Sequence, residues 1–221
     1  MQVRQAMHEP DRPICLVDFF EPGARRDQMA EIVFRRQIVR KQLFTRGTNH
    51  KGTDAMSFKL SSQSFRDGDY LSEAHILSKD FGFGCAGGNQ SPHLTWSGAP
   101  SGTKSFAVTC YDPDAPTGSG FWHWLVVNIP VTATELPLNA GNPQAGKLPA
   151  GALQTRTDFG KPGYGGPCPP PNDHPHRYIF TIFAVSQETL PVTSDTSAAV
   201  VGFNLNFNTV AKAALMGLFK R

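Results

Sequence analysis

Two short segments of the chain hold most of the residues that could do chemistry. Segment 111–128 reads YDPDAPTGSGFWHWLVVN, and segment 163–185 reads GYGGPCPPPNDHPHRYIFTIFAV. Each places one histidine, His123 or His176, where a loop rich in proline and glycine runs into an apolar strand. Imidazoles, carboxylates, tyrosine hydroxyls and backbone amides on a rigid rim can bind a small polar or anionic ligand. The two segments therefore predict a small pocket at the ends of strands.

The first segment supplies two carboxylates, Asp112 and Asp114, where a predicted strand ends. If the extended geometry continues, both side chains point to the same side. One of them would then accept hydrogen bonds from loop amides while the other faces a cavity. A purely structural role is the alternative, because Asp and Pro build turns for mechanical reasons.

His123 lies between Trp122 and Trp124 at the entrance of a strand. Strand alternation predicts that the two tryptophans share one face and that His123 lies on the other. A single histidine in such a place is more often a structural residue than a ligand contact.

The second histidine, His176, has a stronger context. Alternation places His176 and Tyr178 on one face and Arg177 on the other, next to a loop of prolines. A histidine and a tyrosine on one face favour a pocket wall. His174 belongs to the loop and is the weaker candidate.

The elements that must position these residues are mainly strands. Alternation predicts a strand at Met56–Leu60, and short apolar runs bounded by turn residues predict buried strands at Ser105–Tyr111, Trp124–Ile129 and Tyr178–Val185. Apolar residues at helical spacing in Ser197–Phe219 predict one or two helices that pack on the sheet.

Composition agrees with a globular β-rich protein. The chain has 221 residues, of which 39% are hydrophobic and 18% charged, and it contains 21 Gly and 18 Pro. The net charge of +3 comes from residues 1–55, so the rest is neutral and does not favour nucleic acid as a partner. No apolar run approaches 18 residues, which predicts no membrane span, and the first twenty residues do not resemble a signal peptide. We therefore expect a cytoplasmic protein.

The four cysteines, Cys15, Cys85, Cys110 and Cys168, lie far apart and form no CxxC motif. A zinc site built from cysteines is therefore not expected. Free thiols are the prediction for a reducing compartment. A bond between Cys85 and Cys168, which both lie in loops rich in glycine or proline, is the less favoured alternative.

Residues 1–55 read differently from the rest and are predicted to be an N-terminal extension, disordered or loosely helical around Asp27–Phe44. An upstream start codon would explain the extension, with Met56 as the natural beginning. A basic arm that binds a partner is the alternative. Residues 56–221 are predicted to form one domain.

Three motifs in this domain carry a family resemblance. They are NxSPxLxW at Asn89–Trp96, DPDAP followed by WHWLVVN, and GYxGPxPP followed by HRYxF. In this order and spacing the chain resembles the phosphatidylethanolamine-binding protein family, and more narrowly its bacterial Raf-kinase-inhibitor-like branch. The resemblance covers Met56–Arg221 and does not include residues 1–55.

The resemblance implies a mainly β fold, with a large central antiparallel sheet packed on a smaller sheet and a few helices, including C-terminal ones. It also implies an anion pocket for phosphate or phosphoryl groups. Asp173 stands where bacterial relatives commonly have Gly, so the loop before His176 could have a different shape. By motif position, the ligand-binding residues are Asp112, Asp114, His123, Pro169, Pro170, His176 and Tyr178, with Tyr164 as a looser match.

The sequence favours a binding protein over an enzyme. It contains no GxSxG motif, no serine or cysteine with a motif-defined base and no phosphate-binding loop. We expect no cofactor and no metal, and modest affinity for free phosphate because the pocket residues include no Lys or Arg. The expected partner is a phosphorylated small molecule, lipid head group or side chain.

Three other functions stay open. They are a hydrolase or metal site using Asp112, His123 and His176, a kinase or protease inhibitor, and a homodimer or a complex with a protein partner.

Overall fold

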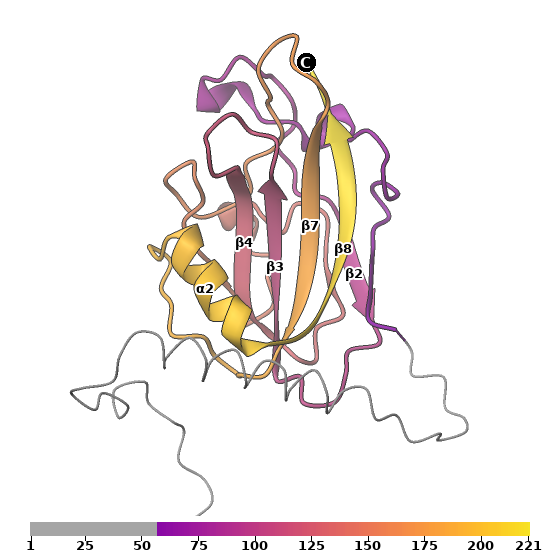
Figure 1. Ribbon diagram of the computed structural model, residues 1–221, viewed down its shortest axis with the longest axis vertical. Helices are drawn as coiled ribbons and strands as arrows, with labels where there is room; N and C mark the ends of the chain where they lie inside the picture. The colour runs from indigo at the N-terminus through magenta and orange to yellow at the C-terminus, as the bar shows by residue number, and fades with distance from the viewer. Residues whose placement is uncertain (1–56) are drawn as a thin grey trace, which may run out of the picture. The chain divides into compact units, whose positions relative to one another are not determined.

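The computed structural model describes residues 57–221, and the predicted extension 1–55 lies outside the described residues. The described part contains two antiparallel sheets (Figure 1). Five strands in the order β6-β4-β3-β7-β8 form the large sheet, and three in the order β1-β2-β5 form the small one. The predicted fold class is thus confirmed. Within residues 57–221, no helix is long and apolar enough to cross a membrane.

The elements follow one another with long loops between them. The strands are β1 (Lys59–Ser61), β2 (Leu94–Ser97), β3 (Ser105–Asp112), β4 (Phe121–Pro130), β5 (Glu135–Leu136), β6 (Leu153–Gln154), β7 (His176–Val185) and β8 (Thr209–Phe219). Within residues 57–221 the α-helix is α2 (Ala198–Asn208), and the short 3-10 turns are η1 (Glu73–His75), η2 (Lys79–Phe81) and η3 (Pro143–Ala145).

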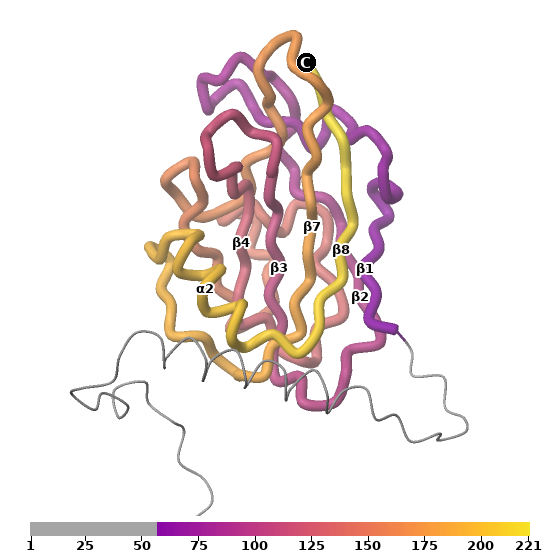
Figure 2. Tube along the Cα trace, viewed as in Figure 1, coloured from indigo at the N-terminus to yellow at the C-terminus, as the bar shows by residue number. Residues whose placement is uncertain are grey.

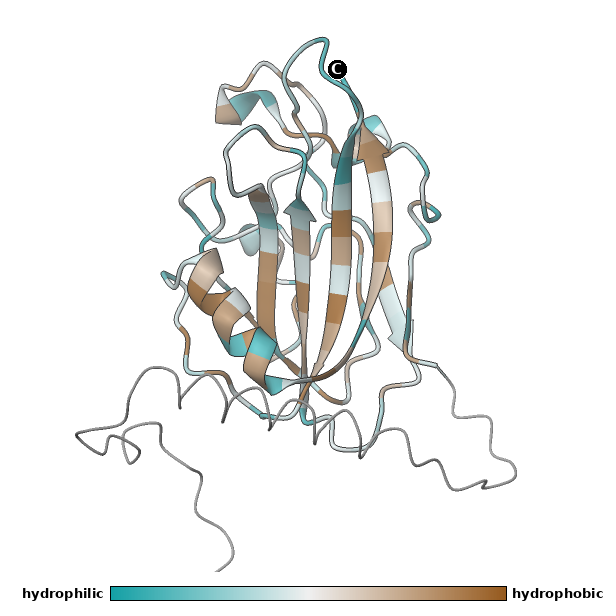
Figure 3. Ribbon diagram, in the orientation of Figure 1, coloured by the Kyte–Doolittle hydropathy of each residue, from teal (hydrophilic) through white to brown (hydrophobic). Residues whose placement is uncertain are grey.

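The central strands β3 and β4 of the large sheet are buried on both faces, which explains their near-continuous apolar runs, whereas the edge strand β8 has exposed residues on one face. On one face, side chains such as Phe106 and Phe180 pack with Trp96 and other residues of the small sheet. On the other face, side chains such as Leu125 pack with Val201 of α2. Figure 1 shows α2 lying across β4 and β3, and Figure 3 shows apolar bands on these strands. The three predicted strands are confirmed, with β7 buried on one face and half-buried on the other.

The prediction of one or two helices over Ser197–Phe219 was right only for the first half of that segment, which contains α2. Residues 209–219 are not helical but form β8, which pairs antiparallel with β7 over its whole length (Figure 2). In β8 the side chains of Ala211, Ala213 and Leu215 pack on the core, which is a period of two. Ala, Leu and Met are good helix formers, but the open edge of β7 offers backbone partners that outweigh this preference.

Candidate functional site

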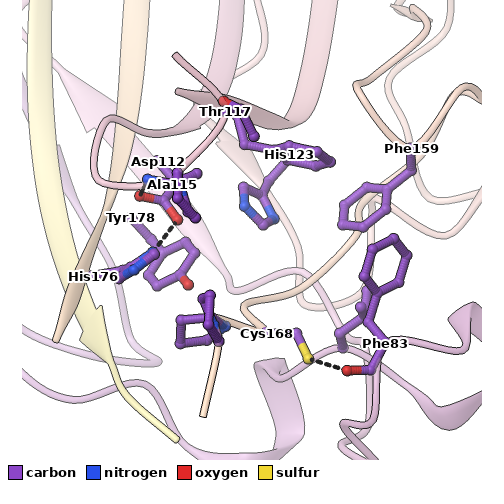
Figure 4. Close-up of a pocket in the computed structure, with 14 residues that line it drawn as sticks. Phe83, Asp112, Ala115, Thr117, His123, Phe159, Cys168, His176 and Tyr178 are labelled. Atoms are coloured by element: carbon purple, nitrogen blue, oxygen red, sulfur yellow. Dashed lines mark hydrogen bonds and ion pairs between the residues drawn. The ribbon is translucent and has the colours of Figure 1, made fainter. Parts of the chain in front are cut away.

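A cavity of about 180 Å³ lies at one end of the large sheet (Figure 4). In antiparallel neighbours the end of one strand lies beside the beginning of the next. The end of β3 and the beginnings of β4 and β7 therefore meet at this edge, and each brings a polar residue to it. The lining residues are Leu77, Phe83, Asp112, Ala115, Pro116, Thr117, Phe121, His123, Phe159, Cys168, Pro169, Pro170, His176 and Tyr178.

Asp112, the last residue of β3, is buried and uses both carboxylate oxygens. Its Oδ1 accepts hydrogen bonds from the backbone N–H groups of Asp114 at 2.8 Å and Ala115 at 3.1 Å. Its Oδ2 lies 2.8 Å from Nδ1 of His176. A carboxylate can only accept, so the proton of this bond is on Nδ1. Asp112 thus shapes the DPDAP turn and also orients the imidazole.

His176, the first residue of β7, is buried between two carboxylates. Its Nδ1 faces Asp112, and its Nε2 lies 3.3 Å from Oδ2 of Asp173. Burial lowers the pKa of His176, but the hydrogen bonds and charges of Asp112 and Asp173 outweigh it, and the pKa is raised. The ring can therefore carry a positive charge inside the cavity wall.

A β-bulge sets the direction of His123. Tyr111 pairs with Trp122 and Cys110 pairs with Trp124, so His123 is the extra residue on β4. The predicted alternation was therefore wrong here: Trp124 packs between the sheets, while Trp122 packs against the cluster under α2. The bulge turns the His123 ring toward the cavity, where it meets the ring of Tyr178 edge-on at 5.1 Å.

The protonation of His123 follows from its only hydrogen bond to the described residues. Its Nδ1 lies 2.7 Å from the carbonyl oxygen of Gly165, so Nδ1 must donate. Burial lowers the pKa of His123, although the Gly165 carbonyl and the charge of Asp112 partly oppose this. The ring is neutral near pH 7, with an unprotonated Nε2.

Tyr178 brings a hydroxyl group to the same space. Its oxygen is buried and has no hydrogen-bond partner among the described residues. Burial, followed by the charge of Asp112, raises its pKa, so the hydroxyl stays protonated. A buried donor without a partner is costly, and a ligand in the cavity could relieve that cost.

The loop that carries Gly165 is held by Asn89, the first residue of the NxSPxLxW motif. The Asn89 side chain donates to the Tyr164 carbonyl at 3.0 Å and accepts from the Gly166 N–H at 2.8 Å. A side chain at Gly166 would collide with the backbone at His75, so only glycine permits this approach. The first motif therefore acts on His123 through the loop.

Three phenylalanines form an apolar wall that the sequence did not reveal. The ring of Phe159 lies edge-on to Phe121 at 4.8 Å and to Phe83 at 5.8 Å, and all three line the cavity. They come from separate loops and from the start of β4, and none belongs to a recognisable spacing. Only the fold brings them together.

The prediction of free thiols was wrong for two of the cysteines. Cys85 and Cys168 form a disulfide with a Cα–Cα distance of 5.9 Å, which joins two loops at the cavity rim. Cys110 is a buried free thiol, and Cys15 lies outside the described residues. The spacing of cysteines in sequence gave no signal because the bond closes a separation of 83 residues.

The side chain of Arg221 also connects the two loops at the rim of the cavity. The guanidinium donates to the carbonyls of Pro169 and Phe83, both at 3.0 Å. These two loops are the ones that the disulfide joins. The rim of the cavity is therefore cross-linked by a covalent bond and by two hydrogen bonds.

The structure brings six of the eight predicted site residues to the cavity and places two elsewhere. Asp112, His123, Pro169, Pro170, His176 and Tyr178 line it. Asp114 instead accepts bonds from the Arg177 guanidinium at 2.7 and 2.9 Å, which lowers the pKa of Asp114 to about 2. Tyr164 is buried, and its hydroxyl donates to the His75 carbonyl at 3.0 Å.

Comparisons with known proteins agree with this architecture. The family model described as "Phosphatidylethanolamine-binding protein" matches residues 61–220. The chain is 54% identical to UPF0098 protein YbcL of Escherichia coli (strain K12), over 75% of this chain and 89% of that protein. It is 51% identical to UPF0098 protein YbhB of the same organism, over 73% of this chain and 99% of that protein.

Solved structures give the same result. The crystal structure of E. coli YbcL, described as a new member of the mammalian PEBP family, matches with a TM-score of 0.72, covering 74% of this chain and 98% of that one. A homologue from Chlamydia trachomatis, 25% identical, matches with a TM-score of 0.61 over 75% of this chain and 98% of that one. The chain therefore belongs to the phosphatidylethanolamine-binding protein family.

Proposed function

We propose that this protein is a non-catalytic binding protein whose cavity takes a phosphate or phosphoryl group. The ligand would be a phospholipid head group, a phosphorylated metabolite or a phosphorylated side chain. The observation that carries the proposal is the Tyr178 hydroxyl, which has no hydrogen-bond partner within the described part of the chain and shares a small cavity with His123 and His176. Phosphate oxygens accept hydrogen bonds from a hydroxyl and from protonated imidazole nitrogens.

The charge of the site limits its affinity for free phosphate. Among residues 57–221 no Lys or Arg lines the cavity, and Arg177 on the neighbouring face is held by Asp114. Of these lining residues only the histidines can carry positive charge, while Asp112 contributes a buried negative charge. An anion alone would therefore bind weakly.

The phenylalanine wall favours a ligand with an apolar part next to its phosphoryl group. Phe83, Phe121 and Phe159 offer ring surfaces, and apolar contact adds about 25 cal/mol for each Å² removed from water. Phenyl phosphate and phosphotyrosine should therefore bind more tightly than inorganic phosphate.

Two possible nucleophiles at the cavity are already engaged, which supports binding without catalysis. The Thr117 hydroxyl donates to the Gly120 carbonyl, and Cys168 is bonded to Cys85. An activated nucleophile needs a base beside it, and neither group has one in this arrangement. Release of phosphate from phenyl phosphate that His176→Ala abolishes would refute the non-catalytic proposal.

Titration calorimetry with inorganic phosphate, phosphoethanolamine and phenyl phosphate tests the proposal. Tyr178→Phe removes only the hydroxyl. We expect it to lower the affinity for phenyl phosphate by about tenfold, because that is the contribution of a hydrogen bond to a charged group. Tyr111→Phe is the matched control, because the Tyr111 hydroxyl donates to Ser119 away from the cavity. Equal affinities of wild type, Tyr178→Phe and His123→Ala for all three ligands would show that the cavity is not the site.

Binding should also take up a proton. Neutral His123 presents an unprotonated Nε2, and an anion beside it favours the protonated ring or a ligand P–OH. The charges of Asp112 and Asp158 act in the same direction. Because the pKa of the free ring is below its usual value, uptake should occur near pH 7 and affinity should rise as the pH falls. Calorimetry in buffers with different ionisation enthalpies measures the number of protons taken up on binding. Zero uptake would contradict the role of His123.

A cytoplasmic location is a further part of the proposal, and the disulfide provides its test. Thiols in the cytosol are kept reduced, whereas disulfides persist in oxidising compartments. Cells lysed with an alkylating reagent would show whether Cys85 and Cys168 are free or bonded in place. A fully bonded pair would contradict the cytoplasmic proposal. Sedimentation at two protein concentrations tests the homodimer that the sequence leaves open.

A further inference from the structure

Next to the cavity, one short loop brings three groups together that could bind a metal ion. Asp173, His174 and His176 each offer a ligand atom, and these atoms lie within 4.8 Å of one another. The sequence D-H-x-H places them within four residues, where the loop enters β7. Oδ1 of Asp173 is 2.8 Å from Nδ1 of His174, and its Oδ2 is 3.3 Å from Nε2 of His176. One carboxylate therefore faces both imidazoles.

The buried residue of this group is already oriented as a metal ligand would be. Asp112 accepts the Nδ1 proton of His176 at 2.8 Å and so leaves Nε2 as the nitrogen that faces Asp173. Histidines that bind metals usually donate their other N–H to a carboxylate, which fixes the ring and increases its basicity. His176 meets this condition through its bond to Asp112.

The surrounding charges favour a cation. Asp112 and Asp173 place two carboxylates around His176, and the nearby Arg177 is occupied by the Asp114 carboxylate. His174 is 62% exposed, so its ring can rotate toward an ion without moving the core. The buried His176, the exposed His174 and the carboxylate of Asp173 can therefore bind one ion together.

We propose that Asp173, His174 and His176 bind a divalent transition metal ion, with Zn²⁺ as the best match. Two imidazoles and one carboxylate suit Zn²⁺, which often takes three protein ligands and leaves a further position open. Asp112 is the positioning residue that holds His176. This site differs from the sequence expectation of no metal, and it does not require the proposed anion function.

The test is a zinc titration of the full chain, without an affinity tag and in phosphate-free buffer, by calorimetry and by competition with a chromophoric chelator. Wild type should bind one Zn²⁺. His174→Ala and Asp173→Asn should each lower the affinity for Zn²⁺ by at least about tenfold. Both changes are near the surface and leave the core intact. In Asp112→Asn the carboxylate behind His176 is lost, and the affinity should fall by about 10–100-fold.

Glu135→Gln is the matched control. It removes an exposed carboxylate that lies 3.2 Å from a single histidine, His93, and should leave the zinc affinity unchanged. Histidine ring resonances followed by NMR give a second readout, in which His174 and His176 should shift together on addition of Zn²⁺. The proposal is overturned if His174→Ala and Asp173→Asn bind Zn²⁺ as wild type does, or if the wild-type dissociation constant is weaker than about 1 mM.

Discussion

The bond between Asp112 and His176 gives the sharpest prediction about the site. Replacing Asp112 by Ala removes the acceptor of three hydrogen bonds, two from loop amides and one from the imidazole. Breaking a buried charged pair by removing one partner costs about 3–5 kcal/mol. We expect Asp112→Ala to lower the free energy of unfolding by about 4 kcal/mol.

Asp112→Asn separates the two roles of this carboxylate. Its amide oxygen can still accept from the N–H groups of Asp114 and Ala115, but its charge is lost and its NH₂ group meets Nδ1 of His176. The expected cost is the charged bond alone, about 2 kcal/mol. Asp67→Asn is the control, because Asp67 is an exposed acceptor of one backbone N–H, from Met216 at 2.8 Å.

Urea denaturation of the single variants and of Asp112→Asn combined with His176→Gln measures these values. The double-mutant cycle should give a coupling energy of about 1–2 kcal/mol between the two side chains. A coupling below about 0.5 kcal/mol, or equal losses for Asn and Ala at position 112, would refute the view that Asp112 holds the ring.

Three further predictions concern stability. The pKa of Asp114, about 2 in the folded protein, lies below its usual value, so its pair with half-exposed Arg177 contributes about 1 kcal/mol above pH 4, after allowing for solvent screening. Denaturation should show that Asp114→Asn lowers the free energy of unfolding by this amount at pH 6 and that the difference from wild type is lost as the pH falls below about 2. Reducing the Cys85–Cys168 bond frees a separation of 83 residues and should lower the free energy of unfolding by about 4 kcal/mol; equal urea midpoints with and without reductant would contradict this. Gly202→Ala lies within α2 with open space around the added methyl group and should stabilise the protein by up to about 1 kcal/mol in thermal unfolding.

Local patterns were enough to predict the central strands, and they failed where pairing decided the outcome. The apolar runs at Ser105–Tyr111 and Tyr178–Val185 correspond to β3, which is buried on both faces, and to β7, which is buried on one face and half-buried on the other. Residues 209–219 contain good helix formers, yet they form β8 because the edge of β7 is available to them. Strict alternation also failed at His123, because a bulge depends on the register with β3 and not on the local sequence.

The sequence by itself determined the family, the mainly β class and most of the polar groups of the site, since these depend on residue types at fixed spacing. Tertiary structure alone decided what those groups do. It turned Asp114 to Arg177, joined Cys85 to Cys168 and assembled three distant phenylalanines into one wall. The physical reason is that hydrogen bonds, disulfides and apolar contacts act over a few ångströms in space. Distance along the chain does not reveal them until the sheets have packed.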